Sequence, residues 1–242
     1  MAAPPDDDAL RARSLHHAHA GSPALTDVSL GVEAGEVLAV CGPRGSGKTT
    51  LLRCLSGQTV PDRGEVWFGA AAVHTLSPLQ RERLRRERFG WIDPAPTLVP
   101  ELTVWENAAL PLLLRGDPHR LARAAALDWL ERLDIAPHAH RRPHALTQPQ
   151  RQRTATARAL IAVPSVLFAD EPTATLHRAD RALVLRTLLA AARSHRITVV
   201  LATHDPEVAA LADRTVPLLD GRRTDAPDTA EAEGQAECSL SV

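Results

Sequence analysis

The segment Gly42-Pro-Arg-Gly-Ser-Gly-Lys-Thr49 limits what this chain can fold into more than any other feature of its sequence. It follows an apolar stretch at residues 36–41 that is predicted to be a strand, and it precedes residues 48–55, which are predicted to be a helix. The pattern G-x-x-x-x-G-K-[ST] between a strand and a helix is typical of a loop that surrounds phosphate groups with backbone N–H groups. The sequence therefore predicts a nucleoside triphosphate site at the start of this helix.

Each part of this loop has a predicted task. Glycines allow successive backbone N–H groups to point toward the β-phosphate, while Lys48 reaches the β- and γ-phosphates and the Thr49 hydroxyl binds Mg²⁺. Lys48 is the only lysine of the chain, and arginine does not replace it well because the ammonium group is a more compact charge. The residues predicted to bind ATP are Gly42, Pro43, Arg44, Gly45, Ser46, Gly47, Lys48, Thr49 and Thr50.

A second group of candidate residues ends an apolar run at residues 166–169. A buried strand of this kind delivers the residues that follow it, Asp170 and Glu171, to the carboxyl edge of a parallel sheet, where the phosphate-binding loop also lies. Asp170 is predicted to hold Mg²⁺ through water, and Glu171 to polarise the attacking water as a general base. An Asp-Glu pair that ends a strand before a proline turn is also common without a catalytic role, so this assignment depends on the neighbouring loop.

Predicted strands and helices alternate along the rest of the chain, which indicates an α/β fold with a mostly parallel sheet. Strands are predicted at residues 28–32, 36–41, 64–68, 166–169 and 198–202, and helices at residues 48–55, 77–88, 105–133, 150–161, 179–193 and 206–212. The long helical stretch is expected to break at Pro111 and at Gly116. One domain is predicted at residues 21–223, between a polar N-terminal segment at residues 1–20 and an acidic tail at residues 224–242, both expected to be mobile.

Length and composition predict a cytoplasmic protein with one core. The chain has 242 residues, of which 44% are hydrophobic, and its net charge of -1 provides no basic field that would attract nucleic acid. Its three cysteines lack a metal or disulfide spacing, as expected in a reduced compartment. We find neither a secretory signal nor an apolar stretch of the ~20 residues that cross a bilayer. A role in transport would therefore require a separate membrane protein.

A segment before the apolar run at residues 166–169 resembles the signature of the ATP-binding-cassette (ABC) transporter family. It reads Leu146-Thr-Gln-Pro-Gln-Arg-Gln-Arg-Thr-Ala-Thr-Ala-Arg-Ala-Leu160. Asp170-Glu-Pro-Thr173 and Thr203-His204-Asp205 stand where this family has its Walker B segment and its switch histidine. The resemblance covers residues 25–219, and residues 100–114 are most similar to the branch that releases lipoproteins and exports macrolides.

This resemblance implies a P-loop NTPase with a RecA-like core, a β-rich N-terminal edge and a helical ABC subdomain at about residues 93–160. In such a family two cassettes enclose two ATP molecules head to tail, so that Asp170, Glu171 and His204 of one subunit meet the signature of the other. His204 would contact the γ-phosphate, and the alternative for this residue is a helix-capping or solvated histidine. An integral-membrane permease would be a further partner, which places the chain on the inner face of the cell membrane.

The chain departs from the family pattern in its signature, its Q-loop and its D-loop. Gln148 and Pro149 stand where the signature has two glycines, and Pro149 has no backbone N–H to donate to a phosphate. Loss of one such donor is expected to cost about 1.5–3 kcal/mol of phosphate binding. Pro94 stands at the Q-loop glutamine that touches Mg²⁺ and the catalytic water, with Asp93 as the nearest polar side chain, and His177 replaces the last aspartate of the D-loop.

The site that contacts adenine also differs, because the chain has no tyrosine to stack on the base and His19 stands nearest to that position. Retention of Asp170, Glu171 and His204 predicts that the chain binds Mg-ATP and hydrolyses it as one half of an asymmetric cassette dimer. A homodimer is the alternative arrangement, in which both sites would have the altered signature and turnover would be slow. The main alternative function is that of a regulatory protein that binds nucleotide without significant hydrolysis. A non-transport ABC protein that acts on DNA or ribosomes is disfavoured by the lack of a basic stripe, and a P-loop kinase by the signature-like helix.

Overall fold

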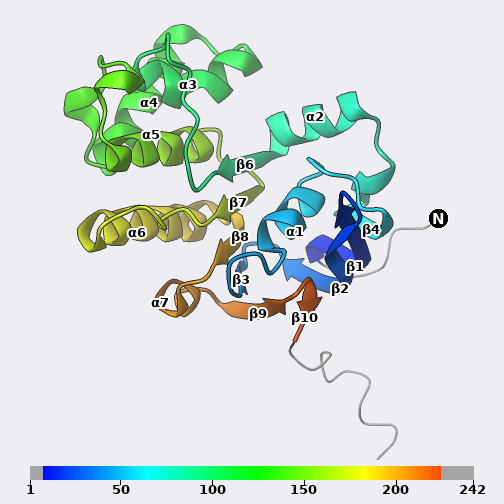
Figure 1. Ribbon diagram of the computed structural model, residues 1–242. Coiled ribbons are helices and arrows are strands. Elements are labelled where there is room, and N and C mark those ends of the chain that lie inside the picture. The colour runs from blue at the N-terminus through cyan, green and yellow to red at the C-terminus, as the bar shows by residue number, and fades with distance from the viewer. Residues whose placement is uncertain (1–7, 225–242) are drawn as a thin grey trace, which may run out of the picture.

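The structure, a computed structural model, describes residues 8–224 as two β-sheets and a set of helices (Figure 1). Residues 1–7 and residues 225–242, which hold nearly all of the predicted acidic tail, lie outside the described part of the chain. The larger sheet has the strand order β10-β9-β3-β8-β7-β6, and the smaller one has the order β2-β1-β4-β5.

The six-stranded sheet confirms the predicted α/β class. Its strands are β3 (Val37–Cys41), β6 (Phe89–Ile92), β7 (Val166–Asp170), β8 (Thr198–Thr203), β9 (Arg214–Leu219) and β10 (Arg222–Arg223). All neighbouring strands are parallel except β9 and β10. Strands β3, β7 and β8 are nearly all buried, as expected for a parallel sheet that is covered on both faces. Their carboxyl ends therefore share one edge, where the residues that follow them can meet.

The four-stranded antiparallel sheet forms the predicted β-rich N-terminal edge. Its strands are β1 (Asp8–His19), β2 (Ser22–Glu33), β4 (Arg63–Phe68) and β5 (Ala71–Ala72). The prediction that residues 1–20 are mobile is wrong for residues 8–19, which pair with both β2 and β4. Leu10, Ala12 and Leu15 of this strand are buried, but register shifts break their alternation. Such bulges interrupt the alternation of apolar and polar residues by which a strand is recognised in a sequence.

The helices lie on both sides of the larger sheet and beyond its β6 edge (Figure 1). They are α1 (Lys48–Leu55), α2 (Pro78–Arg88), α3 (Val104–Arg115), α4 (His119–Arg132), α5 (Gln148–Leu160), α6 (Arg178–His195) and α7 (Pro206–Ala209), with short 3-10 turns at Val73–Thr75, Ala136–His138 and Pro143–Ala145. Helix α3 runs through Pro111, so the predicted break there is wrong. Ala108, Ala109 and Leu112 are buried around it, and this packing outweighs the hydrogen bond that proline cannot make.

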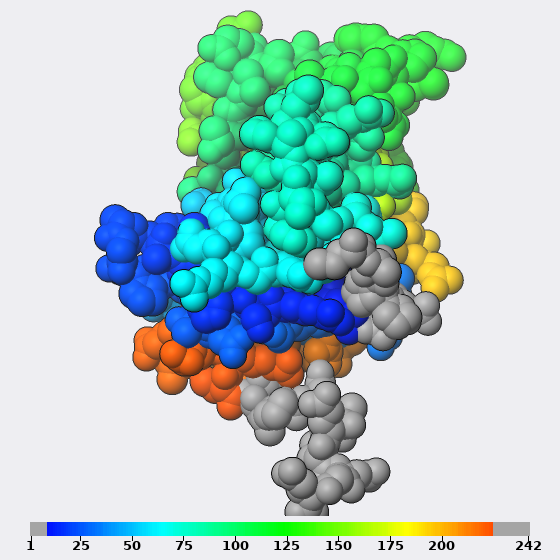
Figure 2. All heavy atoms as spheres, turned by 90° about the vertical axis from the view of Figure 1, so that its right-hand side faces the viewer, coloured from blue at the N-terminus to red at the C-terminus, as the bar shows by residue number. Residues whose placement is uncertain are grey.

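Two apolar cores lie on the two faces of the larger sheet. One core contains Phe168 and Leu51 and joins this sheet to α1 and to the N-terminal sheet. The other contains Leu167 and Leu188 and joins it to α6 and to the group formed by α3, α4 and α5. Seen from the side, α2 and the segment around it lie between this helical group and the N-terminal strands (Figure 2). Within residues 8–224, no helix has the length and apolar character that a membrane span requires.

Thr103 and Glu106 cap the start of α3 reciprocally. A carboxylate oxygen of Glu106 accepts hydrogen bonds from the Thr103 N–H at 2.8 Å and from the Thr103 hydroxyl at 2.6 Å. These two hydrogen bonds lower the pKa of Glu106 below its ordinary value. The resulting stability is present above the pKa of glutamate in the unfolded chain, and it is lost as the pH falls through the lowered pKa.

We therefore expect Glu106→Gln to lower the free energy of unfolding by roughly 0.5–1 kcal/mol at pH 7, because the amide accepts these hydrogen bonds without a charge. Urea titrations at a series of pH values would measure this loss, which should shrink as the wild-type carboxylate becomes protonated. A loss of the same size at every pH would mean that the shape of the side chain matters and its charge does not.

Candidate functional site

The loop at residues 42–47 joins β3 to α1 in a conformation that requires glycine. Gly47 has a φ of 100°, and a Cβ atom there would lie 2.4 Å from the carbonyl oxygen of Ala24. A Cβ atom on Gly42 would lie 2.1 Å from the carbonyl oxygen of Leu218. Both distances are far inside van der Waals contact, so neighbouring backbone holds this loop in place on two sides. The loop ends where α1 begins, which directs the free N–H groups of that helix toward it.

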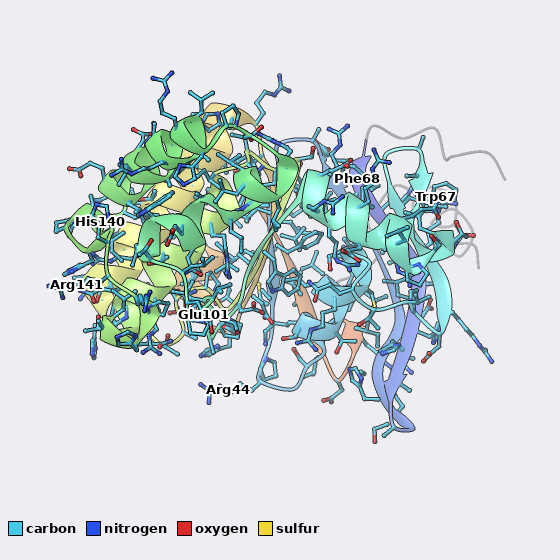
Figure 3. All side chains as sticks on the ribbon, turned by 90° about the horizontal axis from the view of Figure 1, so that it is seen from above. Arg44, Trp67, Phe68, Glu101, His140 and Arg141 are labelled. Atoms are coloured by element: carbon cyan, nitrogen blue, oxygen red, sulfur yellow. The ribbon has the colours of Figure 1, made fainter. Side chains whose placement is uncertain are left out.

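Lys48 is buried beneath this loop, with 6% of its surface exposed. Its ammonium group donates hydrogen bonds to the carbonyl oxygens of Gly42 and Pro43, both at 2.8 Å. The hydroxyl of Ser46 is also buried, and it has no hydrogen-bond partner. A buried cation and an unpaired hydroxyl are costly without a ligand, so this loop fits an anionic phosphate. Arg44 instead projects from the loop into solvent (Figure 3).

Thr49 and Asp170 meet at the start of α1, although 121 positions separate them in the chain. The Thr49 hydroxyl donates a hydrogen bond to one carboxylate oxygen of Asp170 at 2.8 Å. The other carboxylate oxygen, Oδ1, is buried and has no partner. Burial raises the pKa of Asp170, the hydrogen bond from Thr49 opposes this shift, and the charges of Glu171 and Asp93 add to it. A buried, unpaired carboxylate oxygen beside a hydroxyl fits a divalent cation such as Mg²⁺.

Glu171 and His204 form a pair beside this position. The Glu171 carboxylate lies 2.8 Å from Nδ1 of His204 and 3.8 Å from the Lys48 ammonium. Glu171 has a φ of 45°, a strained value for a residue with a side chain, and its N–H donates to the carbonyl oxygen of Ala202 on the adjacent strand. The chain therefore leaves the extended conformation of β7 at Glu171, directly after the strand ends. The predicted residues Lys48, Asp170, Glu171 and His204 thus lie within one site.

Side chains alone do not complete a metal site. Among residues 8–224, no group of three or more His, Cys, Asp or Glu side chains is arranged to hold a metal ion. Mg²⁺ binds with few protein ligands and keeps several water or phosphate oxygens. Thr49 and Asp170 would therefore hold the ion together with a bound nucleotide.

A pocket of about 320 Å³ adjoins the loop on the side of the N-terminal sheet. It is lined by His19, Ser22, Pro23, Ala24, Gly45, Gly47, Lys48, Thr49 and Thr50. Nε2 of His19 lies 3.1 Å from the Thr50 hydroxyl, so the end of β1 reaches the first turn of α1. His19 has only a weak signal in the sequence and residues 22–24 have none, because only the pairing of β1 with β2 brings them to this loop.

The signature-like segment lies in a different part of the molecule. Helix α5 contacts α3, α4, α6 and β6, whereas α1 contacts β1, β2, β4, β7 and β8. At the start of α5 the Thr147 N–H is already engaged by the Gln150 side chain at 3.0 Å, and Gln148 is exposed. Pro94 follows the end of β6, and His177 is exposed immediately before α6. The departures at Gln148, Pro149, Pro94 and His177 therefore do not disturb the contacts among the P-loop, Asp170, Glu171 and His204 described above.

Known proteins are similar to this chain in sequence and in fold. Residues 25–174 match the family described as "ABC transporter". The "Lipoprotein-releasing system ATP-binding protein LolD" of Xanthomonas axonopodis pv. citri is 35% identical over 83% of this chain and 82% of its own length. The "ABC transporter ATP-binding protein YtrE" of Bacillus subtilis is 37% identical over 82% of this chain and 86% of its own length. A dimeric, post-hydrolysis structure of the ATP-binding cassette MJ0796 bound to ADP and Pi has a TM-score of 0.84 at 30% identity, and it covers 89% of this chain and 97% of its own.

Proposed function

Because the chain belongs to the ATP-binding subunits of the ABC transporter family, we propose that it hydrolyses Mg-ATP to drive export through a separate permease. The observation that carries this proposal is the convergence of Lys48, Thr49, Asp170, Glu171 and His204 at one sheet edge. The resemblance to the lipoprotein-releasing branch is confirmed by the LolD relatives.

In this proposal, each residue of the site has a defined task. The loop and Lys48 bind the β- and γ-phosphates, and Thr49 and Asp170 hold Mg²⁺, which neutralises charge on the transferred phosphoryl group. Glu171 accepts a proton from the attacking water, and its pairing with His204 at 2.8 Å fixes the direction of the carboxylate. His204 also contacts the γ-phosphate of the bound ATP and keeps its contact with Glu171. His19 stacks on the adenine ring from the wall of the adjoining pocket.

A second cassette completes each site. The start of α5 lies on the helical group and not on the P-loop, so the signature of one chain would serve the P-loop of another. Here the signature is weak, because Pro149 has no N–H and the Thr147 N–H is held by Gln150. An asymmetric dimer with a partner that has an intact signature would give this chain's own P-loop a complete site.

The permease would bind in a cleft between α2, β6 and α3. This cleft has a volume of about 530 Å³, and its lining includes Arg85, Trp91, Leu110, Pro111 and Leu114. The Leu114 side chain is 64% exposed at its rim. An apolar cleft with basic residues fits a short amphipathic segment of a membrane protein. Such binding would place the chain on the cytoplasmic face of the membrane.

Repair of the signature tests this function. We expect Gln148→Gly with Pro149→Gly to raise steady-state ATP hydrolysis by the purified chain at least tenfold, since one charge-assisted donor is worth about 1.5–3 kcal/mol. Phosphate release at saturating Mg-ATP would measure the effect, and Glu171→Gln in the repaired chain is the control that should abolish it.

A regulatory protein that binds nucleotide without turnover is the second candidate, and it is favoured by Pro94 and His177 as well as by the signature. This second candidate predicts that the repaired chain binds ATP but does not hydrolyse it. Sustained hydrolysis by the repaired chain would exclude it.

A further inference from the structure

Asp93 lies beside Asp170 at the carboxyl edge of the larger sheet. Strand β6 ends one residue earlier, and it pairs with β7 so that Trp91 lies opposite Phe168 and Ile92 opposite Ala169. Because side chains alternate along a strand, Asp93 follows Trp91 onto the face that carries Phe168 and Asp170. This is the face covered by α1, where the Thr49 hydroxyl binds Asp170.

Two hydrogen bonds fix Asp93 in this place. The indole N–H of Trp91 donates to one oxygen of the Asp93 carboxylate at 2.7 Å. The side-chain amide of the fully buried Gln152, on α5, donates to the backbone carbonyl of Asp93 at 3.1 Å. The half-buried carboxylate is thus presented at the sheet edge by both β6 and the helical group.

Two observations indicate that this arrangement is built for a cation. Asp170 has 3% of its surface exposed, and its Oδ1 atom has no hydrogen-bond partner. The carboxylates of Asp93 and Asp170 stand on the same face at the ends of the neighbouring parallel strands β6 and β7, so the two like charges repel each other in the absence of a cation. The half-buried Arg158 also lies within the electrostatic influence of Asp93, but its guanidinium donates a hydrogen bond to the carbonyl oxygen of Thr97.

We propose that Asp93 is a carboxylate of the Mg²⁺ site, which binds a water molecule of the ion held by Thr49 and Asp170. The inference rests on the proposed function, since it concerns the metal of the same site. Asp93 thereby adds a negative charge to the metal site. It directly precedes Pro94, which stands at the position of the Q-loop glutamine.

Binding of Mn²⁺ with ATP tests the proposal, because the paramagnetic ion can be counted without turnover. The full chain carrying Glu171→Gln would be titrated with Mn²⁺ at saturating ATP, and free Mn²⁺ would be measured by electron paramagnetic resonance. We expect Asp93→Asn to weaken Mn²⁺ binding about 10-fold, the lower end of the range for residues that orient metal ligands or their waters. ATP binding in EDTA should not weaken, since the substitution only removes a negative charge from the site.

Two further variants separate the possible outcomes. Asp93→Glu keeps a carboxylate at this position, and it should keep more of the Mn²⁺ affinity than Asp93→Asn. Equal losses for the two variants would assign the effect to packing and overturn the proposal. Asp170→Asn should abolish Mn²⁺ binding. If it does so while Asp93→Asn has no effect, the inference fails and the proposed function stands; if neither variant changes Mn²⁺ binding, both fail.

Discussion

Replacing Lys48 by alanine is expected to weaken Mg-ATP binding at least 100-fold. The ammonium group lies beneath the phosphate-binding loop, where it would form charge-assisted hydrogen bonds to two phosphates worth about 1.5–3 kcal/mol each. Two such bonds correspond to roughly 3 kcal/mol or more, and each 1.4 kcal/mol is a factor of ten. Isothermal titration calorimetry with ATP and Mg²⁺ would measure the loss.

Lys48→Arg is the matched control for this experiment. It keeps the charge, but the planar guanidinium does not fit the space under the loop, where Lys48 contacts the carbonyl oxygens of Gly42 and Pro43 at 2.8 Å. We therefore expect the arginine variant to bind ATP nearly as poorly as the alanine variant. Thermal melting of both variants would show that they fold. Near-normal ATP affinity of a folded Lys48→Ala protein would contradict the assignment of this loop as the phosphate site.

Glu171→Gln is expected to reduce ATP hydrolysis by about 10²–10⁴-fold and to leave ATP binding intact. The amide keeps the size of the side chain and its contact with His204, but it cannot accept the proton of the attacking water. Its effect is best measured as single-turnover phosphate release from the signature-repaired chain, in which hydrolysis is fast enough to detect a large decrease.

His204→Ala provides a comparison for this second result. It removes the partner that directs Glu171 without removing the base, so we expect a smaller decrease in hydrolysis than for Glu171→Gln. Equal rates for the repaired parent and for Glu171→Gln would mean that Glu171 is not the base. The two variants together separate the chemistry of the carboxylate from its positioning.

The candidate site is assembled from segments that lie far apart in the chain. Two kinds of signal predict that Lys48, Asp170, Glu171 and His204 form one group. Each residue belongs to a known motif, and each motif follows a predicted strand whose carboxyl end lies at the same edge of the sheet. Their mutual contacts agree with that prediction, because β3, β7 and β8 are adjacent and parallel. His19 could be proposed as the adenine-contacting residue only from its position in the chain, because its contact with Thr50 depends on how β1 pairs with other strands.

Strand β6 was not predicted, because its sequence is determined by packing against a neighbouring helix and not by local strand propensity. Strand β6 has four residues and contains Gly90, which is a weak strand signal. A Cβ atom at Gly90 would lie 2.6 Å from the carbonyl oxygen of Ala159 on α5, so glycine is required by helix packing and not by local conformation. The pairing of β6 with β7 places Asp93 beside Asp170, so this neighbour of Asp170 cannot be predicted without the strand.

The sequence by itself determined the elements whose signals are local. The P-loop, α1 at Lys48–Leu55 and the buried strand β7 follow from glycine spacing and apolar runs, which act over a few residues. Tertiary structure decided the pairing of β1, the continuation of α3 through Pro111, and the approach of Asp93 to Asp170. These features depend on contacts between segments far apart in the chain, and the free energy of burying them outweighs the local preferences that a sequence displays.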